Sequence, residues 1–285
     1  MASPSSGASF QTFGDPVPLG PVVISVPHGG RAYSPELVAA LRVPVAAVMG
    51  LEDRLIDLVA MAARGDEPML VQTVPRAWID LNRDERERDP LIDAGATMAP
   101  RASAKLRSGL GLVPRRVAGH GDIWARRFSD AEIMARIEGD HRPYHRALAE
   151  RLAAVRARFG VAVLLDLHSM PPLGAVGLVP RIVIGDRHGT TAATRLVRRI
   201  EAEARGHGIA VTRNAPYAGG HVVERHGDPR RGIHAIQLEL DRSLYLDAAL
   251  EAPGPGFDAT VTLVRHILAA LAAEALGQPV AMAAE

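Results

Sequence analysis

Residues 161–170, with the sequence VAVLLDLHSM, decide how the chain can fold. Five apolar residues lead into Asp166, Leu167 and His168, and a Ser-Met-Pro-Pro turn follows. A short, continuous apolar run is typical of a buried strand in a parallel sheet. Side chains alternate along a strand, so Asp166 and His168 share one face, where the carboxylate can orient the imidazole as a metal ligand requires. The structural alternative is a hydrogen-bonded core histidine, which one Asp-Leu-His motif does not exclude.

The composition is that of an ordinary globular protein. The 285 residues are 47% hydrophobic and 23% charged, and the formal net charge is +1, so nothing calls for nucleic acid or an anionic membrane as a partner. The chain has no cysteine, which leaves histidine, aspartate and glutamate as metal ligands. The apolar runs are too short to cross a bilayer, and residues 1–9 do not have the features of a signal peptide. We therefore expect a soluble, cytoplasmic protein.

Apolar strands alternate with amphipathic helices along the chain, which favours a mostly parallel sheet covered on both faces. The expected strands are Val22–Val26, 69–74, 161–170, 181–184, 209–212 and 235–240. The expected helices are 50–64, 129–159 (with a Ser129–Glu132 capping box and a break at Pro143), 190–205 and 258–276. We predict one catalytic α/β domain over residues 1–285, folded as a three-layer α/β/α sandwich with a mostly parallel mixed sheet. Residues 1–15 and 278–285 are expected to be flexible, and residues 89–121 to form an excursion over the site.

Polar side chains stand at the ends of several of these strands. His28, Arg76, His168 and Asn214 each follow a strand, and Glu239 lies near the end of another. In open α/β sheets, ligands bind outside the carboxyl ends of the strands. Convergence of so many polar groups at one sheet edge is difficult to explain by packing, so we expect them to form a functional site.

Two histidines and one carboxylate are the usual protein ligands of a catalytic zinc ion. We assign His28 and His168 as ligands and Asp53 as the third, with Glu52 as the alternative, because both acids open the helix expected at 50–64. Acidic residues at a helix start can also simply complement its dipole. Glu239 is the best-placed general base for a metal-activated water; its structural alternative is a salt bridge with Arg242.

Three residues in the segment that follows the second predicted strand can contact a substrate. Arg76 can stabilise a developing oxyanion. Asn82 and Arg83 can bind a carboxylate, since a guanidinium forms a two-pronged contact with it. For Arg83 considered alone, a surface salt bridge is the better interpretation.

A set of motifs, taken in order, resembles the N-formylglutamate amidohydrolase family from about residue 21 to residue 246. The motifs are Pro27-His28-Gly29-Gly30, Asp53 with Asp57, Asp80-Leu81-Asn82-Arg83, Pro143-Tyr144-His145, Asp166-Leu167-His168-Ser169-Met170, Asn214 with Pro216-Tyr217 and Gly219-Gly220, and Gln237-Leu238-Glu239 with Arg242 and Tyr245. The resemblance implies a zinc-carboxypeptidase-like fold, one zinc ion per chain, and hydrolysis of N-formyl-L-glutamate to formate and glutamate in histidine degradation. It also implies that Asn82 and Arg83 hold the α-carboxylate and that Arg76 polarises the scissile carbonyl.

A small dianionic substrate needs several cationic and polar partners at fixed positions. The candidate substrate-binding residues are Asn82, Arg83, Tyr144, His145, Arg181, Asn214, Tyr217 and Arg242. Tyr144 and His145, with His141, could equally serve as a helix cap and as aromatic packing. Asp241 stands where the family pattern leads us to expect Asn, and His221-Val222-Val223 lacks an expected hydroxyl residue; these departures bear on the acyl substrate.

Other functions fit parts of the pattern. A zinc deacylase or peptidase acting on a different N-acyl amino acid would use the same chemistry, and manganese, iron or cobalt could occupy the same ligands. A non-catalytic binder of acidic metabolites would not need Glu239 as a base. A two-metal phosphoesterase would need a second ligand cluster with a bridging carboxylate, which the sequence does not offer. The sequence leaves the oligomeric state open, including a homo-oligomer.

Overall fold

The computed structural model describes residues 9–97, 102–174 and 179–277. The chain divides into two compact units. The first unit comprises the described residues of Met1–Gln11, Pro27–Asp53 and Val71–Ala147, and the second comprises those of Thr12–Val26, Arg54–Leu70 and Leu148–Glu285. The single catalytic domain expected from the sequence stays a prediction, because a division by compactness does not say which parts act together.

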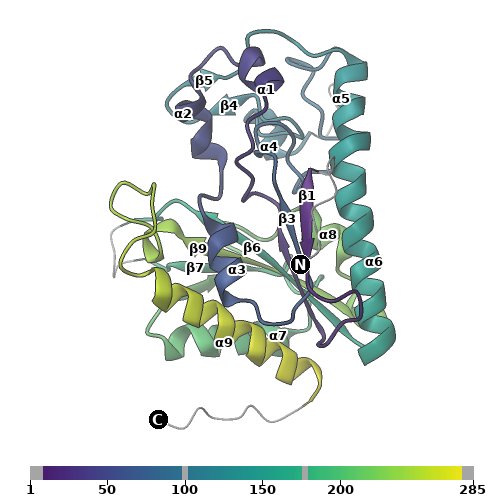
Figure 1. The fold of residues 1–285 in the computed structure, drawn as a ribbon, viewed down its shortest axis with the longest axis vertical. Helices are drawn as coiled ribbons and strands as arrows, with labels where there is room; N and C mark the ends of the chain where they lie inside the picture. The colour runs from purple at the N-terminus through teal and green to yellow at the C-terminus, as the bar shows by residue number, and fades with distance from the viewer. Residues whose placement is uncertain (1–8, 98–101, 175–178, 278–285) are drawn as a thin grey trace. The chain divides into compact units, whose positions relative to one another are not determined.

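A seven-stranded sheet forms the centre of the fold (Figure 1). In order across the sheet, its strands are β1 (Phe10–Phe13), β3 (Met69–Gln72), β2 (Val22–Val26), β6 (Ala162–Met170), β9 (Ile233–Asp241), β7 (Ile182–Gly185) and β8 (Val211–Arg213). Strands β2, β6 and β9 are parallel, whereas β7 runs antiparallel to β9 and parallel to β8. All residues of β2, β6 and β7 are buried, as expected for strands covered on both faces. The predicted mostly parallel mixed sheet is confirmed.

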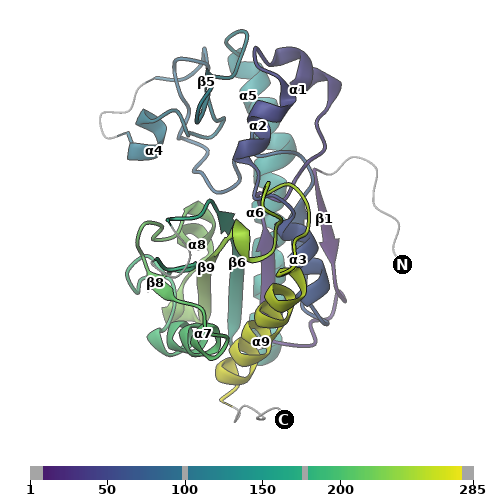
Figure 2. The ribbon, with the colours of Figure 1, turned by 90° about the vertical axis from the view of Figure 1, so that its left-hand side faces the viewer.

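Helices cover both faces of this sheet within the second unit. Helices α3 (Ile56–Ala63) and α9 (Phe257–Ala275) pack against each other and against β2 and β6. Helix α8 (His221–His226) packs against β6 and β9 from the opposite side, and α7 (Thr194–Gly206) packs against α9 (Figure 2). The α/β/α layering predicted from the alternation of strands and helices is therefore confirmed.

The buried strands are where the sequence pattern located them. Strand β2 has the predicted bounds, β6 begins one residue late, and β9 extends beyond the predicted 235–240 at both ends. Strand β1 lies inside the stretch 1–15 that was expected to be flexible. Residues 1–8 of that stretch, and the tail 278–285, lie outside the described residues.

The helix expected at 50–64 begins later than predicted. A 3-10 turn covers Met49–Leu51, and α3 starts only at Ile56, because Leu55 adopts a left-handed conformation with φ of 57° that a continuous helix does not allow. Asp53 therefore does not open a helix. It lies in the connecting turn, where its backbone N–H donates to the carbonyl oxygen of His28 at 3.0 Å.

The long helical region 129–159 contains a π-helical turn just before Pro143, without the gap in the helix that a break there would produce. Helix α5 (Asp130–Arg136) begins with the capping box formed by Ser129 and Glu132. A π-helical turn (Ile137–His141) follows, and α6 (Arg142–Phe159) continues from it. Proline has no N–H to donate to the turn before it, and the wider π-helical turn lies in that preceding turn.

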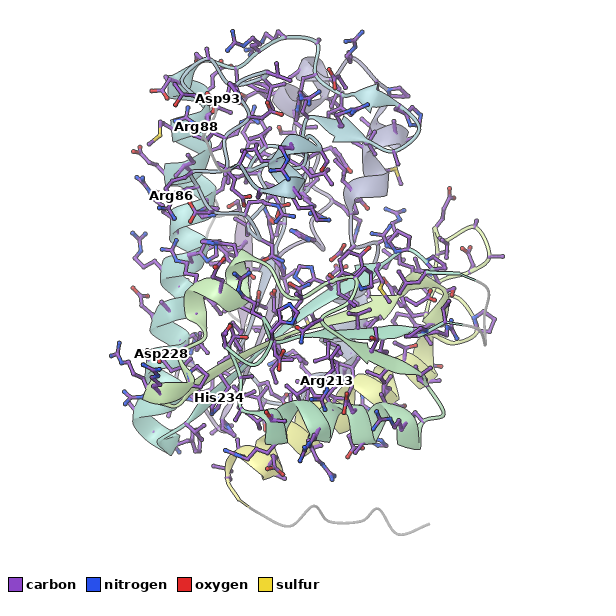
Figure 3. The ribbon with its side chains drawn as sticks, turned by 180° about the vertical axis from the view of Figure 1, so that it is seen from behind. Arg86, Arg88, Asp93, Arg213, Asp228 and His234 are labelled. Carbon is purple, nitrogen blue, oxygen red and sulfur yellow. The ribbon has the colours of Figure 1, made fainter. Side chains whose placement is uncertain are left out.

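Residues 89–121 belong to the first unit and contain little regular structure. Helix α4 (Ala104–Arg107) and the short antiparallel pair β4 (Arg116–Val117) and β5 (Gly121–Asp122) are its only elements among the residues described there. Ion pairs hold this segment: Arg115 donates to Asp89 at 2.9 Å, and Arg88 donates to Asp93 at 2.8 Å (Figure 3). Two short helices, α1 (Pro35–Ala40) and α2 (Val45–Val48), complete the unit. In the described part of the chain, no helix has the length and apolarity to span a membrane.

Candidate active site

The register of the second unit's sheet aligns the polar residues of β6 and β9. His168 lies opposite Glu239 in the parallel pairing of the two strands, and Asp166 lies opposite Gln237. Side chains two residues apart share a face of a strand, so these four residues occupy one face of the sheet near its carboxyl edge. The structure thus brings together His168 and Glu239, which were predicted from two distant parts of the sequence.

A hydrogen-bonded carboxylate orients His168. Oδ2 of Asp166 lies 2.9 Å from Nε2 of His168, and Oδ1 of Asp166 accepts from the Ser25 hydroxyl at 2.7 Å. All three residues are buried. The contact with Asp166 directs the opposite ring nitrogen, Nδ1, away from the carboxylate, which is the arrangement that orients histidine for metal binding.

Gln237 holds Glu239 in place. Its Nε2 donates to Oε1 of Glu239 at 2.8 Å, and its Oε1 accepts from the backbone N–H of Gly220 at 2.8 Å. Gln237 and Glu239 are both less than a tenth exposed. Sequence reasoning gave Gln237 no role, although its period-two spacing from Glu239 on an apolar strand was a usable signal.

The candidate substrate-binding arginines of the second unit have protein partners. Arg181 contacts Oδ2 of Asp241 at 3.5 Å and donates to the Ser243 hydroxyl at 2.9 Å. Arg242 donates to the Ser169 hydroxyl at 3.2 Å. The unexpected Asp241 is therefore the acid that faces Arg181.

Asn214 and Tyr217 lie in the loop after β8. Asn214 has a φ of 57°, and its side-chain amide donates to Asp186 at 2.7 Å and accepts from the backbone N–H of Asp186. Tyr217 is half-buried. Gly219 in the same loop has a φ of 107°, where a side chain would be strained.

Asp80 is the centre of the polar cluster in the first unit. Its Oδ1 lies 2.7 Å from Nε2 of His28 and accepts from the backbone N–H of Asn82 at 2.8 Å. Its Oδ2 accepts from Nε of Arg76 at 2.8 Å and lies 3.7 Å from Nε of Arg83. From the sequence, Asp80 is identified only as part of a motif; its place between the apolar residues Ile79 and Leu81, both buried in the structure, was the available signal for a central role.

The charge of Asp80 is stabilised by its neighbours. Burial alone would raise the pKa of this carboxyl, but the positive charges of Arg76 and Arg83 and the contact with His28 lower the pKa well below the usual value for aspartate. Asp80 is therefore ionised and can only accept hydrogen bonds. It follows that Nε2 of His28 carries the proton and donates it.

The opposite nitrogen of His28 faces Asp53. Nδ1 of His28 lies 3.6 Å from Oδ2 of Asp53, and both residues are buried. Glu52, the alternative third ligand, accepts a hydrogen bond from the Tyr33 hydroxyl at 2.5 Å. The geometry favours Asp53 over Glu52 as the acid beside His28.

Gly30, in the turn after His28, is required by packing. A Cβ atom placed there would lie 2.0 Å from the carbonyl oxygen of Val74, which is an impossible contact. The glycine motif thus allows the His28 turn to approach the backbone after β3, in the segment that leads to Arg76.

Tyr144 and His145 lie in α6, next to the π-helical turn. The Tyr144 ring is fully buried and meets the Phe10 ring edge-on, with centroids 5.4 Å apart. Nε2 of His145 lies 2.9 Å from the carbonyl oxygen of Leu81. The His145 contact links α6 to the segment that carries Asn82 and Arg83.

Comparison with known proteins identifies relatives over most of the chain. A family model described as N-formylglutamate amidohydrolase matches residues 20–246. An N-formylglutamate deformylase of Pseudomonas aeruginosa is 28% identical over 261 residues, which cover 89% of this chain and 93% of that protein. An N-formylglutamate deformylase of Pseudomonas putida is 30% identical over 233 residues, covering 80% and 82%.

Solved structures agree with these matches. The crystal structure of N-formylglutamate amidohydrolase from Ralstonia eutropha JMP134 has a TM-score of 0.82 and 31% identity, covering 94% of this chain and 97% of that one. A gene product of Agrobacterium tumefaciens, at 18% identity, has a TM-score of 0.66 over 95% of this chain and 94% of its own, and shows the same fold.

Proposed function

The chain belongs to the N-formylglutamate amidohydrolase family, and from this premise we propose that it is a metal-dependent hydrolase of N-formyl-L-glutamate or a close N-acyl amino acid. The products are formate (or another carboxylate) and the free amino acid. The observation that carries the proposal is the pair formed by His28 and Asp53, in which two groups that bind cations face each other.

The donor set of the first unit fits a metal ion. Nε2 of His28 donates to Asp80, and Nδ1 lies 3.6 Å from Oδ2 of Asp53. In the neutral form of the ring, a proton on Nε2 leaves a lone pair on Nδ1. A cation is the natural partner of a neutral imidazole nitrogen and a carboxylate oxygen that face each other. Asp80 supplies the carboxylate that orients a ligating histidine from behind.

His168 completes the proposed ligand set. Its orientation by Asp166 repeats that of His28 by Asp80. Ser25, which pairs with Asp166 across β2 and β6, lies only three residues before His28 in the chain. We assign one ion to His28, Asp53 and His168, zinc by ligand type, although manganese, iron or cobalt suits the same N and O ligands.

Glu239 is the proposed general base. The metal, when bound, polarises a carbonyl and lowers the pKa of a water molecule. Glu239 accepts the proton of the attacking water and delivers it to the amide nitrogen as the carbon–nitrogen bond breaks, so the amino acid leaves as an amine. Gln237 keeps the carboxylate oriented during both transfers, because it donates to Oε1.

The remaining candidates are assigned to substrate binding. Arg76 stabilises the oxyanion that develops on the formyl oxygen. Asn82 and Arg83 hold the α-carboxylate, and both are tied to Asp80. Candidates for the rest of the substrate are Arg181, Arg242, Asn214, Tyr217 and Tyr144, whereas Nε2 of His145 lies against the carbonyl oxygen of Leu81.

The biological setting follows from this substrate. Formate release from N-formyl-L-glutamate is the last step of one histidine-degradation route, and we assign the enzyme to that step in the cytoplasm. The rival within the same chemistry is a deacylase for another N-acyl amino acid. It is favoured by Asp241, which places a negative charge beside Arg181 and so weakens one cationic partner of an anionic substrate.

Formate release by the purified protein tests the proposal. The protein is assayed with N-formyl-L-glutamate as isolated, after chelation, and after zinc is restored, with metal content measured at each stage. Loss of activity on chelation and recovery with zinc supports the proposal. If the protein binds metal but releases no formate, its substrate is another N-acyl amino acid. If the protein contains no metal and its activity does not change on chelation, the metal mechanism is overturned.

A further inference from the structure

Two histidines of the helical region hold the backbone on either side of Asn82. Nε2 of His145 lies 2.9 Å from the carbonyl oxygen of Leu81, and Nε2 of His141 lies 2.8 Å from that of Arg83. A carbonyl oxygen can only accept, so both rings donate from Nε2. Both histidines are fully buried, and these bonds are therefore made without competition from bulk water.

A second pair of contacts fixes the start of the same segment. Nη1 of Arg136 donates to the carbonyl oxygen of Trp78 at 3.1 Å, and the Trp78 indole donates to Asp140 at 2.7 Å. The Arg136 guanidinium also stacks between Trp78 and Phe128, 3.7 Å and 4.1 Å from the ring centroids. One helical region thus contacts the 78–83 segment at three backbone carbonyls and one side chain.

The π-helical turn allows these contacts with the 78–83 segment to form at the same time. Arg142 N–H donates to the carbonyl oxygen of Ile137, five residues back, which adds one residue to the turn. In a regular α-helix, residues five apart point in clearly different directions. The wider turn brings Arg136 and His141 onto one side, so both reach the 78–83 segment. Such turns inside α-helices are frequent at functional sites.

We propose that His141 and His145 are positioning residues for the substrate carboxylate. They do not contact the substrate; they hold the carbonyls that flank Asn82, so the Asn82 amide and the Arg83 guanidinium present their donors at a fixed spacing. The inference rests on the proposed function for the role of Asn82 and Arg83, and it gives His145 an indirect role in place of a direct contact.

The test compares three variants of the full chain in kinetics and in hydrogen exchange. His145→Leu removes the donor, His145→Gln keeps an amide that can reach the same carbonyl, and Arg146→Ala alters an exposed neighbour on the same helix. In His145→Leu we expect KM for N-formyl-L-glutamate to rise roughly tenfold, the effect of one lost hydrogen bond, with kcat unchanged because binding is weakened equally in the ground and transition states. His145→Gln and Arg146→Ala should behave as the parent protein.

Amide exchange without substrate reports on the segment independently of activity. The Asn82 and Arg83 amides donate to Oδ1 and the backbone oxygen of Asp80, so they should be protected in the parent protein and exchange faster in His145→Leu. If His145→Leu does not fold, His141→Leu takes its place in the test, because it removes the companion hydrogen bond to the Arg83 carbonyl.

The outcomes separate the two proposals. Unprotected amides in the parent protein, or unchanged exchange and KM in a folded leucine variant, overturn the positioning role. A fall in kcat at constant KM also overturns it, because the histidine would then act on the chemical step. If the parent protein releases no formate but the leucine variant exchanges faster, the positioning of the segment stands while the assigned substrate fails.

Discussion

The two clusters of polar residues are built in different ways. In the second unit, His168 and Glu239 occupy opposed positions on adjacent parallel strands, and the neighbours Asp166 and Gln237 are opposed in the same register. In the first unit, the polar residues belong to a connection without regular structure and are gathered around one ionised carboxylate, Asp80.

This difference decides what a mutation can disturb. A sheet position is fixed by many backbone hydrogen bonds, so a substitution of similar shape at Glu239 changes chemistry and leaves geometry intact. In the first unit, several side chains share Asp80, and removal of its charge affects each of them. Local effects are expected in the strand cluster and coupled effects in the loop cluster.

The largest effect is expected when a ligand is removed from either cluster. His28→Ala and His168→Ala should each abolish metal binding and lower kcat by roughly a thousandfold, since a metal ion supplies several kcal/mol of transition-state stabilisation. Metal analysis of the purified variants measures this. If each variant retained half of the parent's metal, the two clusters would hold separate ions, and the assignment of one shared ion would be wrong.

Glu239→Gln should lower kcat by about a hundredfold or more, the contribution of a general base. Gln is nearly isosteric with Glu, so bound metal and KM should not change. Steady-state kinetics with metal analysis measures the effect, and Glu150→Gln, on an exposed position of α6, is the control. Near-normal turnover would remove Glu239 from the mechanism.

Asp80→Asn and Asp166→Asn compare the two clusters directly. Each removes the carboxylate behind a histidine, and we expect a loss of about 10- to 100-fold in metal affinity. Only Asp80→Asn should also raise KM, because Asp80 additionally holds Asn82 and Arg76. Zinc titration and kinetics of both variants measure the contrast; equal effects on KM would contradict the distinction between local and coupled clusters.

Arg83→Lys should raise KM for a carboxylate substrate by about tenfold with little change in kcat, since an ammonium cannot reproduce the two-pronged contact of a guanidinium. Steady-state kinetics measures KM, with Arg86→Lys, an exposed neighbour, as the control. Unchanged kinetics would show that Arg83 does not bind the substrate and serves only in its ion pair with Asp80.

The smallest effect concerns the start of the helical region. Ser129→Ala removes the N-cap of α5 and should cost about 1 kcal/mol of stability, a decrease of roughly 2–4 °C in Tm for a domain of this size. Activity should not change. Thermal unfolding followed by circular dichroism measures the shift in Tm. A rise in KM in the same variant would show that the helix cap and the segment carrying Asn82 and Arg83 are coupled.

The sequence alone determined the sheet and one face of its carboxyl edge. Continuous apolar runs located β2, β6 and β9, and the period of two placed Asp166 beside His168. These features depend on local geometry, which repeats every two residues whatever the rest of the chain does. The capping box at Ser129 is local in the same sense.

Only the tertiary structure shows the contacts of Asp80, Asp53 and the helical histidines. Asp80 meets partners that are not its immediate neighbours in the chain, and one of them, His28, is far from it in sequence. Its pKa is low because the surrounding positive charges outweigh the effect of burial. Leu55 ends the predicted helix early and places Asp53 in a turn. No periodicity encodes such contacts, because they arise from the packing of segments that are distant in the chain. The sequence therefore specifies the polar groups on the strands more openly than those on the loops and helices.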